Sequence, residues 1–450
     1  MMYTPHTDAD REEMLRTIGV KNIADLFQDV PAAHRFPELA LPSAMTEMEI
    51  LAELQALAWA NDTARELICF LGAGAYNHYI PAAVDAILRR GEFYTAYTPY
   101  QPEISQGTLQ AIFEYQSLIA GLTGMEVCNA SHYDGATAVA EAVNMSHHHF
   151  RGKRPKVVLS PAVHPQYRDT VRTYTQDSDV VLVGDQGEVD PTANPQALLP
   201  LLDDTTSLVV VQYPDFFGRV FDYTDLAKAV HQAGGLLCVA VNPLALGLLK
   251  PPGEFGADIV TGEGQPLGIP LSYGGPYLGL FATRQEYVRR MAGRLVGETV
   301  DNRGQRAYVL TLTAREQHIR RERATSNICT NQGLMVLAAT VYLSLLGKHG
   351  LRQVAELCYH KAHYAAQRIA SLRGYDLWSK VPFFNEFALH CPRPVDEVND
   401  FLLDQGILGG YALGRDYPDF EKVMLLAVTE MNSKEDIDAL VDVLREVSHA

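Results

Sequence analysis

Short apolar runs rich in β-branched residues alternate with helical stretches between about residue 105 and residue 285. The helical stretches that open this region lie near 106–120 and 134–150. The apolar runs that predict strands are Lys156–Ser160, Val180–Val183, Leu208–Val211, Leu236–Val241, Ile259–Thr261 and Leu278–Thr283. Strands separated by helices form βαβ units, so this pattern predicts a mostly parallel sheet with helices on both faces.

The segments that flank this region have other patterns. Residues 1–45 hold short segments broken by prolines, and a helix should begin near Thr46, because Thr46 and Glu49 make a capping box before an apolar run. On the other side, long helices are predicted near 331–347 and 350–371. The first flank predicts a helical arm, and the second predicts buried helices that end the large α/β region.

The last part of the chain has its own mixed pattern. Asn385–His390 and Val423–Val428 are predicted as strands, and Val395–Gln405 and Lys434–Val447 as amphipathic helices. The fold class we predict is α/β. Its three parts are an N-terminal helical arm over residues 1–65, a large, mostly parallel α/β/α domain over 66–372 and a small C-terminal α/β domain over 373–450.

Composition narrows the kinds of partner. The net charge of -17 opposes non-specific binding to nucleic acid or to an anionic membrane surface. The six cysteines are scattered without a C-x-x-C pair, which indicates reduced thiols rather than a metal site. The N-terminus has no apolar signal-peptide core, and the longest apolar run, Leu334–Leu346, is too short to span a membrane. We therefore expect a soluble cytoplasmic protein without a metal, a nucleic-acid partner or a membrane partner.

An unusual polar and aromatic segment precedes the helix at 106–120. Residues 92–107 read EFYTAYTPYQPEISQG, and the two prolines favour a fixed, extended loop. Such a loop could present hydroxyls and amides to a small polar ligand, and the plainer alternative is an aromatic loop that packs on a neighbour. The candidate site residues in it are Tyr94, Tyr97, Tyr100, Gln101, Glu103 and Gln106.

The run YTAYTPYQPEISQG at residues 94–107 resembles a signature of the glycine decarboxylase family, the P-proteins of the glycine cleavage system. Three more stretches agree with the family and keep its order: FLGAGAY at 70–76, YDGATA at 133–138 and RATSNICT at 323–330. The length of 450 residues is similar to that of the separate alpha subunits in the two-chain members. The resemblance implies a fold-type I pyridoxal-phosphate transferase-like fold.

The family's chemistry needs a lysine that forms an imine with pyridoxal phosphate, an aspartate at the pyridine nitrogen and a stacking histidine. Through the stretch IPLSYGGP at 269–276, the resemblance places the lysine position at Gln265 and the aspartate position at Ala240. A glutamine amide cannot form the imine. The histidine corresponds to His164, for which we expect a vestigial role. We therefore expect no catalytic lysine and no bound cofactor in this chain.

The resemblance implies a glycine dehydrogenase (aminomethyl-transferring) that needs a beta subunit, in an alpha2-beta2 heterotetramer. Pyridoxal phosphate is expected in the beta subunit, where glycine loses CO2 and its aminomethyl group passes to the lipoyl-lysine of the H-protein. Fold-type I sites lie at dimer interfaces. We therefore expect the tyrosine-rich loop, residues 92–107, to approach the active site of the beta subunit. We expect the turn Thr325, Ser326 and Asn327 to donate hydrogen bonds to the cofactor phosphate.

Other interpretations stay open for the sequence. The chain could be a non-catalytic scaffold for the beta subunit, although a scaffold has no need of a polar aromatic loop. An independent pyridoxal-phosphate lyase or aminotransferase is opposed by Gln265. The local clusters of basic residues fit ion pairing at a subunit interface or docking of the acidic lipoyl carrier; they are Arg289 and Arg290, Arg294, and Arg320, Arg321 and Arg323. Consecutive histidines at 147–149 point in different directions on a helix and indicate no metal site.

Overall fold

The computed structural model describes residues 6–64 and 66–449, which fall into two compact units. The first unit ends at Asp62, and the second begins at Thr63. Residues 1–5 and 65 of the predicted arm and residue 450 of the predicted small domain lie outside the described residues.

The first unit is a series of short helices without a buried core. Its helices are α1 (Asp8–Ile18) and α2 (Glu47–Trp59), with 3-10 turns at Ile23–Phe27 and Ala32–His34. The predicted capping box before α2 is confirmed: the Glu49 carboxylate accepts from the Thr46 backbone N–H at 2.8 Å, and the Thr46 hydroxyl accepts from the Glu49 N–H at 3.4 Å. No described residue of α1 or α2 is buried.

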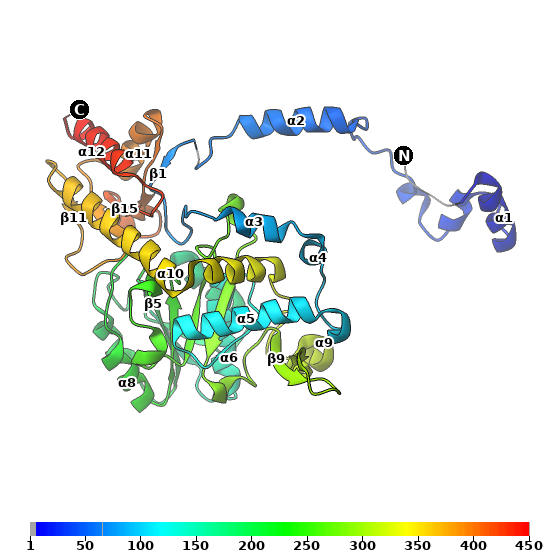
Figure 1. The fold of residues 1–450 in the computed structure, drawn as a ribbon, viewed down its shortest axis with the longest axis horizontal. Coiled ribbons are helices and arrows are strands. Elements are labelled where there is room, and N and C mark those ends of the chain that lie inside the picture. Colours follow the sequence, from blue (N-terminus) through cyan, green and yellow to red (C-terminus); the bar gives the residue numbers. More distant parts are fainter. Residues whose placement is uncertain (1–5, 65, 450) are drawn as a thin grey trace. The chain divides into compact units, whose positions relative to one another are not determined.

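The second unit is built on a seven-stranded sheet (Figure 1). Its strands are β2 (Val127–Cys128), β3 (Lys156–Leu159), β4 (Val181–Val183), β5 (Thr206–Tyr213), β6 (Leu236–Val241), β7 (Ile259–Glu263) and β8 (Gly279–Thr283). They lie in the order β2-β8-β7-β6-β5-β3-β4, in which β3 to β7 are parallel and β8 is antiparallel to β7. The six predicted strands and the mostly parallel sheet are confirmed.

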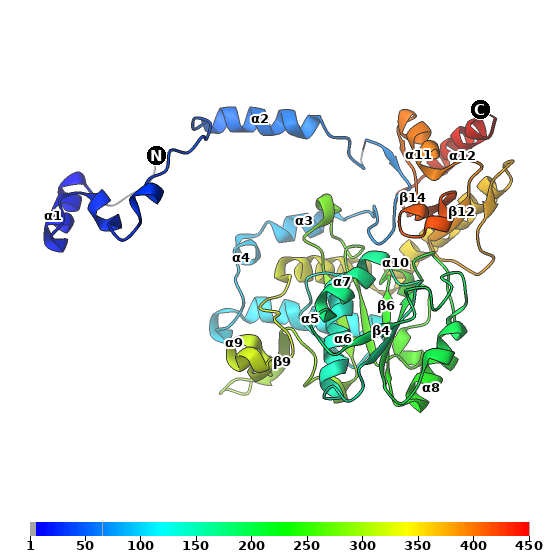
Figure 2. The same ribbon diagram turned by 180° about the vertical axis from the view of Figure 1, so that it is seen from behind.

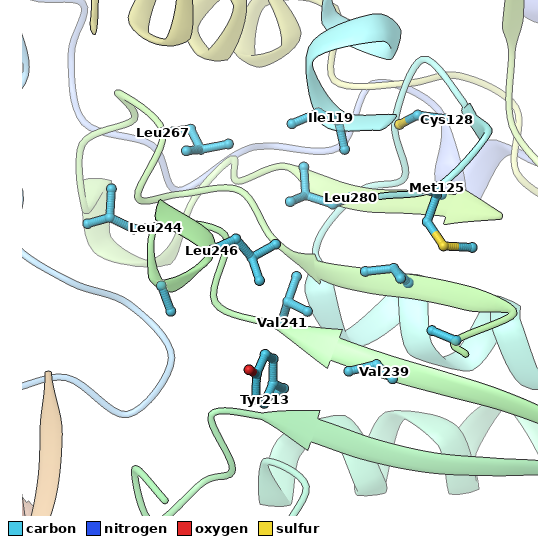
Figure 3. Packing of buried hydrophobic residues seen from close by; sticks show 14 of the residues in the cluster. Ile119, Met125, Cys128, Tyr213, Val239, Val241, Leu244, Leu246, Leu267 and Leu280 are labelled. Atoms are coloured by element: carbon cyan, nitrogen blue, oxygen red, sulfur yellow. The ribbon is translucent and has the colours of Figure 1, made fainter. Parts of the chain in front are cut away.

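Helices cover both faces of this sheet (Figures 1 and 2). They are α5 (Gln106–Thr123), α8 (Thr224–Gln232) and α10 (Gly333–Ala370) on one face, and α6 (Gly135–His149) and α7 (Pro165–Thr175) on the other. Val209 and Val211 of β5 pack on the first face, whereas Leu208 and Val210 pack on the second. The two-residue period of a strand thus gives each side of the sheet its own apolar core. Figure 3 shows part of the first core.

The long helix α10 belongs to two cores. Its backbone leaves the helical conformation at Gly347, where φ is 56°, which agrees with the two predicted helices that meet there. Tyr342 and Leu343 before this break pack on the large sheet, and Ala362 and Ile369 after it pack in the C-terminal core. Among the described residues, α10 is long and apolar enough to cross a membrane by length and composition, but core helices have the same properties.

The C-terminal part has a four-stranded antiparallel sheet in the order β11-β12-β15-β14. Its elements are β11 (Asp376–Leu377), β12 (Glu386–His390), α11 (Val395–Asp404), β14 (Tyr411–Ala412), β15 (Val423–Ala427) and α12 (Lys434–His449). Beside it, β1 (Ile68–Cys69) pairs in parallel with β13 (Ile407–Leu408). The start of the second unit therefore packs with the end of the chain.

The remaining elements border the tyrosine-rich loop and the Thr-Ser-Asn turn. They are α3 (Ala82–Leu88), α4 (Gly91–Tyr94), the hairpin of β9 (Leu295–Val300) and β10 (Arg306–Thr311), and α9 (Gln317–Arg320).

Glu430, which follows β15, bonds to two segments distant in sequence, one at residues 78–79 and one at Cys358 in α10. Its Oε2 lies 2.7 Å from His78 Nδ1 and accepts from Cys358 Sγ at 3.3 Å, while its Oε1 accepts from the Tyr79 N–H at 2.7 Å. His78, Cys358 and Glu430 are residue types that can bind a metal ion. Nitrogen and oxygen ligands of a tetrahedral zinc ion lie about 3.3 Å from each other. The 2.7 Å between His78 Nδ1 and Glu430 Oε2 is shorter and is the distance of a hydrogen bond. Burial by itself would raise the pKa of Glu430, but the hydrogen bond and charge of His78 hold it below its usual value.

Replacing Glu430 should strongly destabilise the second unit. Glu430→Ala leaves the buried His78 ring without its charged partner and removes the acceptor of the Tyr79 N–H, and we expect it to lower the free energy of unfolding by about 3 kcal/mol. Urea unfolding measures this change. The exposed Glu421→Ala is the matched control and should change stability by less than about 0.5 kcal/mol. Equal effects of the two variants would contradict the role of Glu430.

Candidate functional site

Gln265 lies just after β7, at the carboxyl end of the parallel strands, where ligands bind in folds of this kind. Its side chain is buried, and its Nε2 donates to the backbone oxygens of Tyr76 at 2.9 Å and of Ile269 at 2.8 Å. Its Oε1 accepts from the Tyr76 N–H at 2.9 Å. Both donors of the amide are used, so this side chain ties two backbone segments together.

Glu263 fills the N-terminus of helix α6. Its carboxyl group accepts the backbone N–H of Gly135, the first residue of α6, at 2.9 Å, and those of Gln265 at 2.9 Å and Leu278 at 3.0 Å. Burial raises the pKa of Glu263 to about 8, and the three N–H donors act in the opposite direction. Helix N-termini at this edge of an α/β sheet commonly bind phosphate, but here the Gly135 N–H donates to Glu263 and the Thr137 N–H donates to the capping residue Asp134.

His164 is held by its own chain on three sides. Its Nδ1 accepts from the Gln166 N–H at 3.2 Å, so the proton lies on Nε2, which donates to the Ala73 oxygen at 2.8 Å. The ring stacks on Tyr167 with centroids 4.7 Å apart. Burial lowers the pKa of His164, which favours the neutral ring. The stacking face that a cofactor ring would need is therefore covered by Tyr167.

Tyr167 also closes the space beside α6. A Cβ added at Gly135 would lie 2.4 Å from the Tyr167 hydroxyl oxygen, so a glycine is needed there for the tyrosine to fit. At the predicted aspartate position, Ala240 is a buried alanine within the core under α6 and α7. The pocket of this chain thus offers an amide, a carboxyl group, a tyrosine ring and a methyl group, without an amine for the imine or an acid for the pyridine nitrogen. These residues do not fit the cofactor.

The loop from Gly72 to Tyr76 covers this pocket. The Tyr76 hydroxyl donates to Glu386 Oε2 at 2.5 Å, and the Ala73 N–H donates to Glu386 Oε1 at 2.7 Å. Burial raises the pKa of Glu386 to about 7. Because Gln265 and His164 also bond to this loop, the two sequence-predicted positions lie against one common segment.

The tyrosine-rich loop is mostly open to solvent. Tyr94 and Tyr97 are 67% and 81% exposed, and Gln101 and Glu103 are exposed as well. Tyr94 and Tyr97 line a hollow of about 210 Å³ together with Thr330 and Asn331. The exposed hydroxyls and amides are free to meet another surface.

Gln106 differs from the other residues of the loop. Its Nε2 donates to the backbone oxygens of Pro102 at 2.7 Å and Tyr308 at 2.9 Å, and its Oε1 accepts from the Tyr308 N–H at 2.9 Å. It therefore fixes the loop to β10.

The predicted Thr-Ser-Asn turn lies apart from the hollow beside Tyr97. The Ser326 hydroxyl donates to Glu141 Oε1 at 2.8 Å and accepts from the Ile328 N–H at 3.0 Å. Burial raises the pKa of Glu141 to about 7. Thr325 and Ser326 line a small hollow with Glu316, and Asn327 is exposed. Of the three side chains, Asn327 is the one that faces solvent freely.

Sequence reasoning missed Glu263 and Tyr167. The signal for Glu263 was available, because an acid between two glycines at the end of an apolar strand is unusual. Tyr167 gave no signal, since one tyrosine in an amphipathic helix does not reveal which ring it stacks on.

The fold and pocket define a structural class: the chain has the fold of the fold-type I pyridoxal-phosphate-dependent enzymes. A Lactobacillus brevis glutamate decarboxylase structure matches with a TM-score of 0.68 over 94% of this chain and 97% of that one, and its 15% identity shows the fold alone. A solved glycine decarboxylase (P-protein) of the glycine cleavage system, in inhibitor-bound form, matches with a TM-score of 0.90 and 43% identity over 99% of this chain and 100% of that chain.

The sequence comparisons identify the family. The profile described as glycine cleavage system P-protein matches residues 1–444. A probable glycine dehydrogenase (decarboxylating) subunit 1 from Thermomicrobium roseum is 57% identical over 448 residues, which covers 100% of both chains. The chain belongs to the glycine cleavage system P-protein family, as the motifs at 70–76, 94–107, 133–138 and 323–330 predicted.

Restoring the lysine by itself should not restore cofactor binding. We expect Gln265→Lys to form no borohydride-stable adduct at residue 265 with added pyridoxal phosphate, because Glu263 still accepts the Gly135 N–H at the start of α6 and Tyr167 still stacks on His164. Mass spectrometry after reduction measures the adduct, and Gln265→Met, of similar length without an amine, is the control. A stoichiometric adduct on residue 265 of the single variant would contradict the filled pocket.

The raised pKa of Glu263 predicts a pH dependence of stability. Its pKa is about 8 in the folded chain and 4.5 when unperturbed, so the folded state holds the proton more tightly. This contribution is complete below about pH 4.5 and is lost as the pH rises through about 8.

The free energy of unfolding of wild type should therefore fall between about pH 5 and about pH 8.5, and Glu263→Gln should make the slope shallower. Urea unfolding at several pH values measures both, with the exposed Glu421→Gln as the control. Identical slopes for wild type and Glu263→Gln would show that this carboxyl group is not the source.

Proposed function

We propose that this chain is the alpha subunit of a glycine decarboxylase of the glycine cleavage system, active as a glycine dehydrogenase (aminomethyl-transferring) only with a beta subunit. The observation that carries the proposal is the pocket at Gln265, in which the amide is fully hydrogen-bonded, within a chain of the P-protein family. The name of the relatives, subunit 1, supports a second subunit. The complex is an alpha2-beta2 heterotetramer in the cytoplasm.

In this proposal, pyridoxal phosphate is bound by the beta subunit, because the residues at 240, 263, 265 and 167 of this chain do not accommodate it. The cofactor supplies the electron sink for decarboxylation. The complex releases CO2 from glycine and transfers the aminomethyl group to the lipoyl-lysine of the H-protein. No step is assigned to a cofactor in this chain.

The contribution of this chain is its tyrosine-rich loop. Tyr97, Gln101 and Glu103 are exposed and polar. The hydroxyl of Tyr97 and the amide of Gln101 are donors that suit the glycine carboxylate, whereas the acidic Glu103 suits the entrance of the partner's site. The exposed Asn327 turn is the second segment directed to that site. Donors from a second chain would orient the substrate and help to exclude water there.

A non-catalytic scaffold is the second candidate function. The absence of buried residues in α1 and α2 supports it, because the exposed apolar residues of α2, such as Leu51 and Leu54, suit a protein contact. The two candidate functions make different predictions for the tyrosine-rich loop. If the role of this chain is assembly alone, the loop has no need of exposed hydroxyls and amides.

Loop variants in the assembled complex distinguish the two functions. We expect Tyr97→Ala and Gln101→Ala, co-expressed with the beta subunit, to lower kcat/KM for glycine by roughly tenfold or more, which corresponds to one lost hydrogen bond to a charged group. Glycine-dependent exchange of CO2 with lipoylated H-protein measures the rate. Tyr359→Phe, on α10, is the control.

Sedimentation of each complex shows whether the variants assemble. Normal assembly with normal turnover would remove the loop from the reaction and leave the scaffold. Borohydride reduction of the wild-type complex should label the beta subunit alone, and a label on this chain would contradict the assignment of the cofactor.

A further inference from the structure

Arg294 is a buried arginine that contacts the tyrosine-rich loop at Tyr100. It directly precedes β9, and its side chain is 2% exposed. Its Nη2 donates to the Tyr100 hydroxyl at 2.8 Å, and its guanidinium carbon lies 5.0 Å from the centre of the Tyr100 ring. It therefore contacts both the hydroxyl and the ring of Tyr100.

The other side of Arg294 meets the segment that leads to the Thr-Ser-Asn turn. Its Nη1 donates to Glu316 Oε2 at 3.3 Å, and the Glu316 backbone oxygen accepts the N–H groups of Ile319 and Arg320 in α9. The His318 ring also packs edge-on to Tyr100, with centroids 6.4 Å apart. One guanidinium thus joins the loop at 100 to the segment from 316 onward.

This arrangement is poorly suited to stability alone. Both charges are buried, and Arg294 Nε and Glu316 Oε1 have no hydrogen-bond partner in the described part of the chain. Buried ion pairs with unused donors and acceptors gain little over apolar side chains of the same size. What the pair supplies is a fixed geometry between two surface segments.

The three tyrosines of the loop differ in how they are held. Among them, Tyr100 is the one whose hydroxyl has a hydrogen-bond partner in the described residues, while Tyr94 and Tyr97 are largely exposed. Tyr97 lies three residues before this anchor, and Gln101 follows it directly. The position of the exposed groups therefore depends on Tyr100.

We infer that Arg294 is a positioning residue for glycine turnover: through Tyr100 and Glu316 it sets the tyrosine-rich loop against the segment 316–327, the two surfaces directed to the partner's site. This inference rests on the proposed function. Arg294 itself touches neither substrate nor cofactor, and it acts through the tyrosine.

The test uses Arg294→Lys, which keeps the charge but cannot bond to both partners in the fork geometry of arginine. Tyr100→Phe removes the same hydrogen bond from the exposed side and keeps the ring, so it serves if the first variant folds poorly. The control is Arg352→Lys, on the exposed surface of α10. All variants are made in the complex with the beta subunit.

Two measurements are combined. Hydrogen exchange of residues 94–104 reports the order of the loop without reference to turnover, and we expect it to rise in Arg294→Lys and Tyr100→Phe but not in the control. We expect kcat/KM for glycine to fall roughly tenfold in each, and the double variant to be no worse than Arg294→Lys, because the bond to the Tyr100 hydroxyl is already lost in that variant.

Unchanged hydrogen exchange would overturn the role of Arg294, whatever the rate. Faster exchange with normal turnover would overturn it as well, because the loop position would then not matter for the reaction. A wild-type complex without glycine turnover would instead overturn the proposed function, so the two failures are distinguishable.

Discussion

The hydrogen bonds of the Gln265 amide hold the pocket together. One side chain binds both the N–H and the carbonyl group of Tyr76 and also reaches the carbonyl group of Ile269. The loop at 72–76 is thereby fixed over the carboxyl ends of the strands. There the Ala73 carbonyl accepts from His164, and the Ala73 N–H donates to Glu386. A lysine at position 265 could not make the same contacts, since an ammonium group has no acceptor for the Tyr76 N–H.

The residues that line the pocket do not fit pyridoxal phosphate, because side chains of the chain itself occupy the space. A cavity lined by unused backbone N–H groups would be costly, because buried donors need partners. In this chain Glu263 satisfies the N-terminus of α6, and Tyr167 covers His164. The close contact between Gly135 and Tyr167 shows that this packing is tight. Contacts within the chain therefore stabilise this pocket.

In contrast to the pocket, where the polar groups bond to one another, the surface of the second unit carries polar groups that are exposed to solvent. The tyrosine-rich loop keeps its polar groups exposed and is held by two joints, Gln106 on β10 and Tyr100 on Arg294. Rigid presentation of exposed polar groups is what a binding partner requires, because a preformed loop loses little conformational entropy on binding. Side chains of this chain fill its pocket, while the polar groups of its loop stay exposed. Both features are consistent with a chain that contributes residues to the site of another subunit.

The sequence by itself determined the layers of the fold and the family. Alternating apolar runs predicted the parallel sheet, since strands buried on both faces must be apolar along their whole length. The motifs at 70–76, 94–107, 133–138 and 323–330 predicted the P-protein family, and the glutamine at 265 predicts that this chain offers no amine for the imine. Gln106 was predicted as a site residue for the same reason as Gln101, because their side chains have identical chemistry.

Only the tertiary structure decided which of these side chains are free and which are used. Gln106 is bonded to a strand some 200 positions away in the sequence, at Tyr308, and Glu263 meets the helix that begins at Gly135. Such contacts depend on how the strands and helices pack in three dimensions. A residue's own identity fixes its donors and acceptors, but the groups that satisfy them are supplied by distant parts of the chain.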